Sequence, residues 1–209
     1  MKGIEKAEFR RTLPYFWPLY LVIPAITCFA LTYFMYAVHL PKDNEKVSVF
    51  VASASLDSSS LKKQMEDYLK EKGAKAAQPI YANPNEATFA SKLNVVGYHS
   101  ADLFLLPESV IAGVDIGEVF LPFRPALKEN WVNFSSPTYL MKDGLEFGLR
   151  LHEKGIEDGL SGIIGFLAED YYLCLNPSSK NLGNLGIYDI PEDKLALEAF
   201  SYLQEASLL

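Results

Sequence analysis

The sequence predicts an α/β protein: a single N-terminal transmembrane helix, then a three-layer α/β domain with a parallel strand core in the order 2-1-3. Residues 12–38 form a run of twenty-seven residues without a charged side chain. Residues 47–106 then alternate apolar, β-branched runs with amphipathic stretches, which is typical of a β-α-β-α-β unit. Right-handed crossovers with a helix on each face give such a unit the strand order 2-1-3.

The uncharged run is long enough to cross a bilayer. At 1.5 Å per residue a helix of this length reaches roughly 40 Å, more than the ~30 Å hydrocarbon core. A buried core helix, a cleaved signal peptide and a lipoprotein signal ending at Cys28 are the alternatives. The run is longer than a signal-peptide core and no A-x-A site closes it. The residues before Cys28 also lack the usual lipoprotein pattern, so an uncleaved anchor is favoured.

Basic residues flank this run unequally. Four Lys or Arg residues precede it, whereas Lys42 and Lys46 follow it. The positive-inside rule therefore predicts a cytoplasmic basic tail at 1–11, a transmembrane helix at 12–38 and an extracytoplasmic domain at 47–209. The linker at 39–46 spans at most about 28 Å, so the domain stays near the cell membrane.

Charge and cysteine content narrow the class of protein further. The net charge of −7 argues against nucleic acid as a partner. Cys28 lies in the expected anchor and Cys174 in an expected strand, so we expect no disulfide within the domain. An extracytoplasmic domain without disulfides is more typical of bacteria than of secreted eukaryotic proteins.

The domain has an expected order of elements. Strands are expected at 47–52, 76–81 and 101–106, with one helix starting near Leu61 and a second capped by Asn83 with Pro84 at its first position. The later part predicts a strand at 130–134, a hairpin at 138–152 around an Asp143-Gly144 turn, strands at 163–166 and 171–175, and a helix opened by Pro191. The stretch 140–175 either extends the sheet or forms a small second lobe.

Two segments of the domain carry a family-like pattern. The third strand runs into Ala-Asp-Leu-Phe-Leu-Leu-Pro-Glu-Ser at 101–109, and Tyr-Tyr-Leu-Cys-Leu-Asn at 171–176 leads into Ser-Ser-Lys-Asn-Leu-Gly at 178–183. This pattern resembles type II extracytoplasmic solute-binding proteins, over residues 47–209. The resemblance implies a domain that binds a small solute, such as a sugar or peptide, for a transporter or sensor. The chain departs from the family in two ways, since those proteins are usually far longer with two lobes and are usually lipoproteins or free, whereas this domain is truncated and membrane-anchored.

Six polar residues follow the three expected parallel strands. Ligands bind at the carboxyl ends of the strands in open α/β sheets, so a ligand site is expected there. Its candidate residues are Ser53, Ser55, Asp57, Asn83, Glu108 and Ser109. The serines at 53–60 precede a helix and suit an anion or a hydroxylated ligand, but they also suit a solvated helix cap. Glu108 and Ser109 equally suit a strand end and a helix cap.

No motif for catalysis, metal or cofactor emerges. The histidines are isolated in sequence, and the Gly159-x-x-Gly162-x-x-Gly165 run lacks the flanking strand and helix of a dinucleotide loop. We therefore expect no cofactor, no metal and no enzymatic activity. Two functions remain: a solute-binding-like accessory domain of a transport or sensing complex, or a protein-interaction or scaffolding domain of a bacterial membrane complex without a small-molecule ligand.

Overall fold

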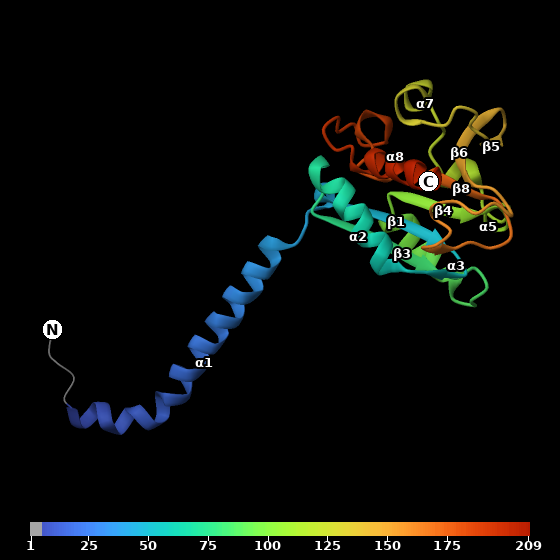
Figure 1. Ribbon diagram of the computed structural model, residues 1–209. Coiled ribbons are helices and arrows are strands. Elements are labelled where there is room, and N and C mark those ends of the chain that lie inside the picture. Colours follow the sequence, from blue (N-terminus) through green and yellow to red (C-terminus); the bar gives the residue numbers. More distant parts are fainter. Residues whose placement is uncertain (1–5) are drawn as a thin grey trace. The chain divides into compact units, whose positions relative to one another are not determined.

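The computed structural model describes the backbone of residues 6–209 and, within the first helix, the side chains of residues 18, 19 and 21 onward. The chain forms two compact units, one ending at Leu40 and the other covering Pro41–Leu209. The first unit is the long helix α1, and the second is an α/β domain with a mixed central sheet (Figure 1).

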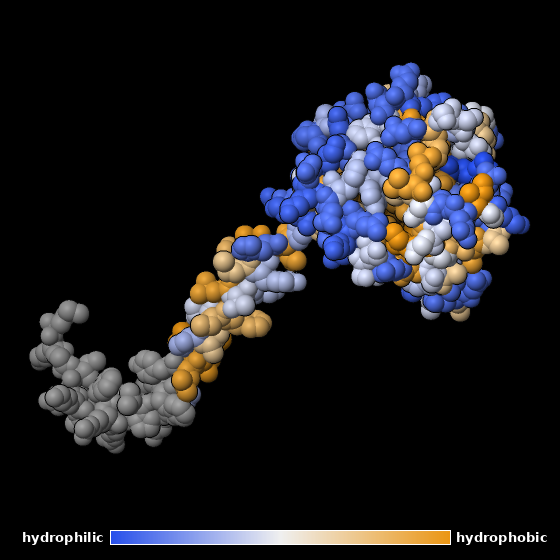
Figure 2. All heavy atoms as spheres, in the orientation of Figure 1, coloured by the Kyte–Doolittle hydropathy of each residue, from blue (hydrophilic) through white to orange (hydrophobic). Residues whose placement is uncertain are grey.

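Helix α1 (Lys6–His39) contains one segment, Leu21–His39, that is long and apolar enough to cross a membrane. None of this segment is buried by the rest of the protein, and hydrophobic residues predominate along its visible face (Figure 2). The hydroxyls of Thr27 and Thr32 donate to the helix's own carbonyls four residues earlier, at 2.8 Å each, which satisfies them without water. Residues 1–5 of the expected basic tail lie outside the described residues, and the helix already begins at Lys6.

The domain is built on one six-stranded sheet in the order β3-β1-β4-β8-β6-β5. Strands β1 (Lys46–Ala52), β3 (Ala76–Ala82) and β4 (Leu103–Pro107) are parallel. Strands β8 (Tyr171–Leu175), β6 (Leu145–His152) and β5 (Tyr139–Lys142) each pair antiparallel to their neighbours. The stretch 140–175 thus extends the sheet.

The alternation of side chains along β1 divides the core in two. Val47, Val49 and Val51 face one core cluster, which includes the buried residues of helices α2 (Ser58–Leu69) and α8 (Leu195–Ser207). Phe50 and Ala52 face the other, together with Phe104 of β4. Helices therefore cover both faces of the sheet, as expected for strands that are apolar on both sides.

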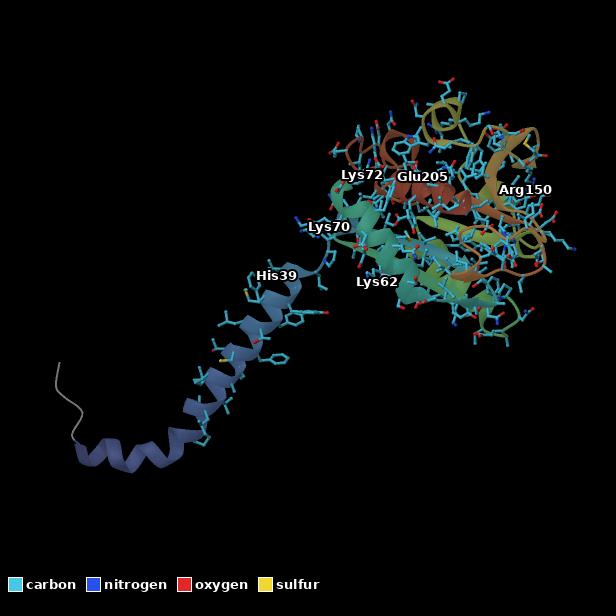
Figure 3. All side chains as sticks on the ribbon, in the orientation of Figure 1. His39, Lys62, Lys70, Lys72, Arg150 and Glu205 are labelled. Carbon is cyan, nitrogen blue, oxygen red and sulfur yellow. The ribbon has the colours of Figure 1, made fainter. Side chains whose placement is uncertain are left out.

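Helices α2 and α8 lie side by side on the first face (Figure 1). The ring of Tyr68 in α2 lies 5.1 Å from that of Tyr202 in α8, and the Tyr202 hydroxyl donates to Gln64 at 3.1 Å. Lys62 and Lys70 are exposed on the outer surface of this region (Figure 3). This is the polar face that the sequence pattern of 61–70 predicts.

The second face is covered by short helical pieces. They are α3 (Phe89–Lys92), the π-helical turn η3 (Leu93–Gly97), α4 (Tyr98–Ser100), α5 (Glu108–Ile111) and α6 (Ile116–Val119). Gly97 permits the close approach of this layer, because a Cβ there would lie 3.3 Å from both Phe50 and Phe104. The layer does not reach the start of β1, where Ser48 pairs in register with Gln78.

The expectation that a helix starts at Asn83 is wrong. The Asn83 side chain accepts a hydrogen bond from the Asn85 amide at 3.0 Å, so it closes a local turn rather than a helix cap. The helix begins at Phe89 instead, and it continues past Gly97 into α4. A side chain that can cap a helix or close a turn gives the same sequence signal for both.

Two later expectations also need correction. Residues expected as a strand at 130–134 follow or belong to helix α7 (Pro125–Trp131), which has Pro125 in its first turn and buries Leu127. The final helix begins at Leu195 rather than Pro191, because residues 190–194 form turns closed by their own backbone amides. The hairpin of β5 and β6 is confirmed, with positive φ angles at both Asp143 and Gly144.

Candidate functional site

The serine-rich loop after β1 is closed by a second segment of the chain. The buried Ser53 hydroxyl donates to the Ser55 carbonyl at 2.8 Å, and Ser55 pairs with Gly165 in a small sheet of β2 (Ser55–Leu56) and β7 (Ile164–Gly165). Asp57 caps α2 by accepting from the Ser60 amide at 3.0 Å. Strand β7 belongs to the loop 153–170, which thus contacts the region where a ligand was expected.

The same loop contacts the candidate residues after β4. The Ser109 amide and hydroxyl both donate to the Glu169 carboxylate, at 2.7 and 2.9 Å, and the Glu108 amide donates to the Asp170 carbonyl at 2.9 Å. Asn83 closes its own turn after β3. The structure therefore brings Ser53 and Ser55 together, and it joins Glu108 and Ser109 to the loop 153–170.

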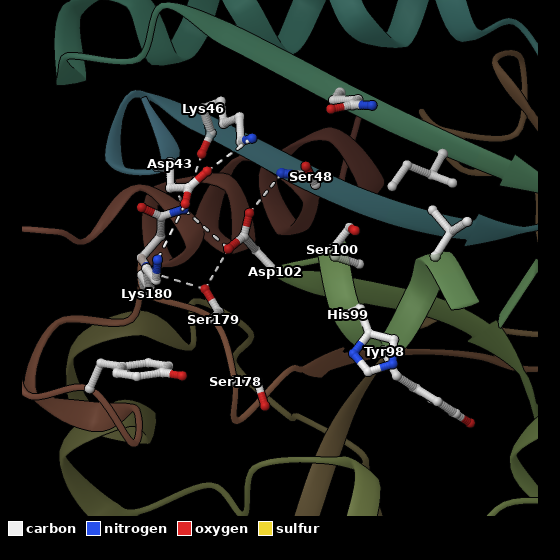
Figure 4. Close-up of a pocket in the computed structure, with 16 residues that line it drawn as sticks. Asp43, Lys46, Ser48, Tyr98, His99, Ser100, Asp102, Ser178, Ser179 and Lys180 are labelled. Carbon is white, nitrogen blue, oxygen red and sulfur yellow. Dashed lines mark hydrogen bonds and ion pairs between the residues drawn. The ribbon is translucent and has the colours of Figure 1, made fainter. Parts of the chain in front are cut away.

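A pocket of about 550 Å³ opens at the opposite, amino edge of the parallel strands. Its walls come from the start of β1, from β3, from the residues before β4 and from the loop after β8 (Figure 4). The loop after β8 reaches this edge because β8 runs antiparallel, with Leu175 opposite Leu103. The pocket residues used below are Asp43, Lys46, Ser48, Asp102, Ser179, Lys180 and Asn181. None of the six residues expected from the sequence lines this pocket.

Asp102 is the central side chain of this pocket wall. It is 8% exposed, and its carboxylate accepts hydrogen bonds from the Ser48 amide at 2.8 Å, the Ser179 hydroxyl at 2.5 Å and the Asn181 side-chain amide at 3.1 Å (Figure 4). Burial raises the pKa of Asp102, although the three donors act to lower it. The network joins the start of β1 to the loop after β8, so it fixes the pocket wall.

Asn181 extends the network to the segment before β1. Its side-chain nitrogen also donates to the carbonyls of Lys46 and Asp43, at 3.0 and 3.2 Å. Three acceptors around the nitrogen define the orientation of the amide group. Its oxygen Oδ1 is buried, and no hydrogen-bond partner for it is found among residues 6–209. One buried acceptor of the network is thus left unsatisfied.

Charged side chains of both signs lie at the pocket. The Asp43 carboxylate lies 3.0 Å from the Lys46 ammonium and 3.3 Å from that of Lys180. Hydrogen bonds from Lys46 and then Lys180 lower the pKa of Asp43. Lysines, carboxyls, hydroxyls and an amide together suit a small polar ligand that has both donors and acceptors.

The pocket offers little for catalysis. The Ser179 hydroxyl donates to a carboxylate rather than to a histidine, so it lacks the base that activates a serine nucleophile. His99 lines the pocket, but its ring makes no hydrogen bond to the described part of the chain. The described residues also contain no cluster of His, Cys, Asp or Glu that could hold a metal ion.

Two segments that line this pocket are visible in the sequence, but no pattern within either segment predicts that they lie side by side. Asp102 stands directly before a buried strand, and the polar run 176–181 follows another. Asn176 ties the two together, donating to the carbonyls of Tyr98 and Ala101 at 3.0 and 2.7 Å. The one sequence signal for this pocket is Asp102 itself. An aspartate directly before an apolar strand is expected to be buried, and a buried carboxylate needs hydrogen-bond partners.

Comparison with models of known protein families gives no match, and comparison with curated protein sequences gives none either.

Proposed function

We propose that this chain is a membrane-anchored, non-enzymatic binding protein whose extracytoplasmic domain holds a small polar solute, such as a sugar or peptide, in the amino-edge pocket. In this role the domain serves as an accessory of a transport or sensing complex. The observation that carries the proposal is the pocket of about 550 Å³ whose wall is fixed by the buried Asp102, Ser179 and Asn181 network.

The anchored part of the proposal is supported by the helix and its flanks. Leu21–His39 is apolar and unburied, and the hydroxyls of Thr27 and Thr32 are satisfied within the helix. The excess of basic residues before the apolar segment supports a cytoplasmic N-terminus. A topology reporter that is active only in the cytoplasm should be inactive when fused after Leu209. Activity at that position would contradict the orientation.

The solute-binding part is supported by the chemistry of the pocket and by the topology of the sheet. Lys46, Lys180 and Asp43 offer charges of both signs to a ligand in the pocket. The order β3-β1-β4 supports the 2-1-3 parallel core that the β-α-β-α-β pattern predicts, and such a core is compatible with the proposed resemblance to type II solute-binding proteins. The proposed site differs from the one expected from the sequence, since it lies at the other edge of the strands.

A thermal-shift screen of the full chain in detergent micelles tests this function. The probes are sugars, amino acids and short peptides. A solute at a hundred times its Kd adds about 2.7 kcal/mol to the free energy of unfolding.

Ser179→Ala and Ser109→Ala are a matched pair for any solute that raises the Tm. Each hydroxyl donates to a carboxylate, but only Ser179 lines the pocket. We expect Ser179→Ala to weaken the shift and Ser109→Ala to leave it unchanged. The opposite pattern would place the ligand at the carboxyl edge, and no shift with any probe would argue against solute binding.

A protein-interaction or scaffolding domain is the second candidate. The observation that favours it is that the loop 153–170 contacts the residues at the carboxyl ends of β1 and β4. A small solute was expected at this edge, so the contact favours a domain without a ligand there. Under this alternative, chemical crosslinking in cells captures a membrane protein beside the domain, and the solute screen gives no shift.

A further inference from the structure

Two exposed apolar side chains line the amino-edge pocket, and an exposed apolar residue precedes each of them in the sequence. Val96 and Tyr188 line the pocket and are 36% and 45% exposed. Their neighbours in sequence, Val95 and Ile187, are 65% and 68% exposed. The two pairs come from separate segments, η3 and the loop after β8, which meet at the pocket. Apolar side chains that gather around a polar mouth indicate a surface with a partner.

The covalent chain limits where this surface can lie. The apolar helix segment ends at His39, and Asp43 already lines the pocket. Four residues of extended chain span at most about 14 Å. The carboxyl edge is farther along the chain by the length of β1, seven residues at about 3.3 Å each. Along the covalent chain, fewer residues therefore separate the pocket mouth from the end of the apolar segment than separate the opposite edge from it.

We propose that the pocket rim, formed by Val95, Val96, Ile187 and Tyr188, rests on the surface of the bilayer that holds the chain's own helix. Valine, isoleucine and tyrosine suit the boundary between headgroups and acyl chains, where tyrosine keeps its hydroxyl in the polar layer. Lys46 and Lys180 line the same pocket, and their ammonium groups suit lipid phosphates. The chain is acidic overall, so the contact depends on the apolar side chains rather than on general attraction to anionic lipid.

This contact rests on the membrane anchor of the proposed function, and it adds the direction from which a solute reaches the pocket. The pocket then opens toward the headgroup layer, and its solute arrives along the membrane surface rather than from the bulk phase. Binding of a solute in the pocket is not needed for the contact itself. The two ideas can therefore fail separately.

Photocrosslinking of the full chain in phosphatidylcholine nanodiscs tests the contact. p-Benzoylphenylalanine replaces Ile187 in one variant and Ile156 in a matched control. Both isoleucines are exposed, at 68% and 52%, but Ile156 lies in the loop that begins after His152, at the carboxyl edge. Lipid adducts are measured by mass spectrometry after irradiation. We expect several-fold more adduct at Ile187 than at Ile156.

Three outcomes contradict the proposal. Equal lipid labelling at both positions, with the chain still resistant to carbonate extraction, overturns the contact and leaves the anchor intact. Adducts at Ile187 that join two protein chains show that the rim binds a second copy instead. Release of the chain by carbonate overturns the contact and the anchored function together. If the Ile187 variant has a lowered Tm, the same probe at Val95 gives the decisive comparison, because Val95 is equally exposed.

Discussion

Replacing Asp102 with alanine removes the acceptor that three donors share at the amino edge. Asn181 keeps its two backbone acceptors, and the Ser179 hydroxyl can rotate toward the pocket. The Ser48 amide has no such choice, because it is a buried backbone donor that points at the lost carboxylate. An unsatisfied buried donor costs about 1–3 kcal/mol, and relief of the buried carboxylate offsets part of the remaining loss.

We therefore expect Asp102→Ala to lower the free energy of unfolding by about 2 kcal/mol. For a domain of this size that corresponds to a fall in Tm of about 4–8 °C. The assay is thermal unfolding of the full chain in micelles, followed by near-ultraviolet circular dichroism. Asp115→Ala is the control, since Asp115 also accepts from a backbone amide and a side chain but is exposed. Its Tm should change little.

The pH dependence gives this prediction a second readout. The pKa of Asp102 is raised in the folded state, so the folded protein keeps a proton that the unfolded chain releases above about pH 4. The stabilisation by this proton is complete below the unfolded pKa and is lost as pH rises through the folded pKa. The Tm difference between wild type and Asp102→Ala should thus shrink from acid to neutral pH. An unchanged Tm, or a difference that grows with pH, refutes the reasoning.

Three further changes test the packing and the buried groups of the domain. Gly148→Ala places a Cβ 2.6 Å from the Cys174 sulfur, so it should lower the free energy of unfolding in urea by about 1–3 kcal/mol. Gly162→Ala has open space around it and should lower this free energy little. Recovery of stability in Gly148→Ala/Cys174→Ala would confirm the clash as the cause. Burial raises the pKa of the Cys174 thiol, so in a Cys28→Ser chain iodoacetamide should label Cys174 only after denaturation, and rapid labelling of the native protein would show that β8 opens. Burial raises the pKa of Tyr171 to about 12, so the folded state holds a proton that the unfolded chain loses near pH 10, and stability falls as pH rises between these values. The Tm of Tyr171→Phe should fall less than that of the wild type between about pH 9 and 11, a range that spans the ordinary tyrosine pKa of about 10. An equal fall in both proteins would contradict this assignment.

The parts of the fold that follow from local pattern could be predicted from the sequence. The uncharged apolar run predicted the long helix. The strands near 47–52 and 101–106 could be predicted because both of their faces are apolar. The Asp143-Gly144 pair predicted a hairpin because both residues tolerate a positive φ. Each of these signals lies within a few consecutive residues.

The candidate site could not be predicted in this way, because it depends on how distant strands pair. Strand β8 inserts antiparallel between β4 and β6, which carries residues 176–181 to the amino edge beside Asp102. A parallel β8 would have placed them at the carboxyl edge. The covering of Ser55 by Gly165 is likewise a contact between segments more than a hundred residues apart. Ligands usually bind at the carboxyl edge of parallel strands, so the sequence predicted a site there. No pattern in the sequence predicted that the loop 153–170 contacts this edge.

Hydrogen exchange measured by mass spectrometry, with and without a solute found in the thermal-shift screen, shows which edge of the sheet holds the solute. We expect slower exchange in the presence of solute at 98–102 and 176–181, the two segments that line the amino-edge pocket. We expect no change at 53–57 and 107–111, which lie at the opposite edge. Protection of those carboxyl-edge segments, with 176–181 unaffected, would contradict the claim that the amino-edge pocket is the binding site.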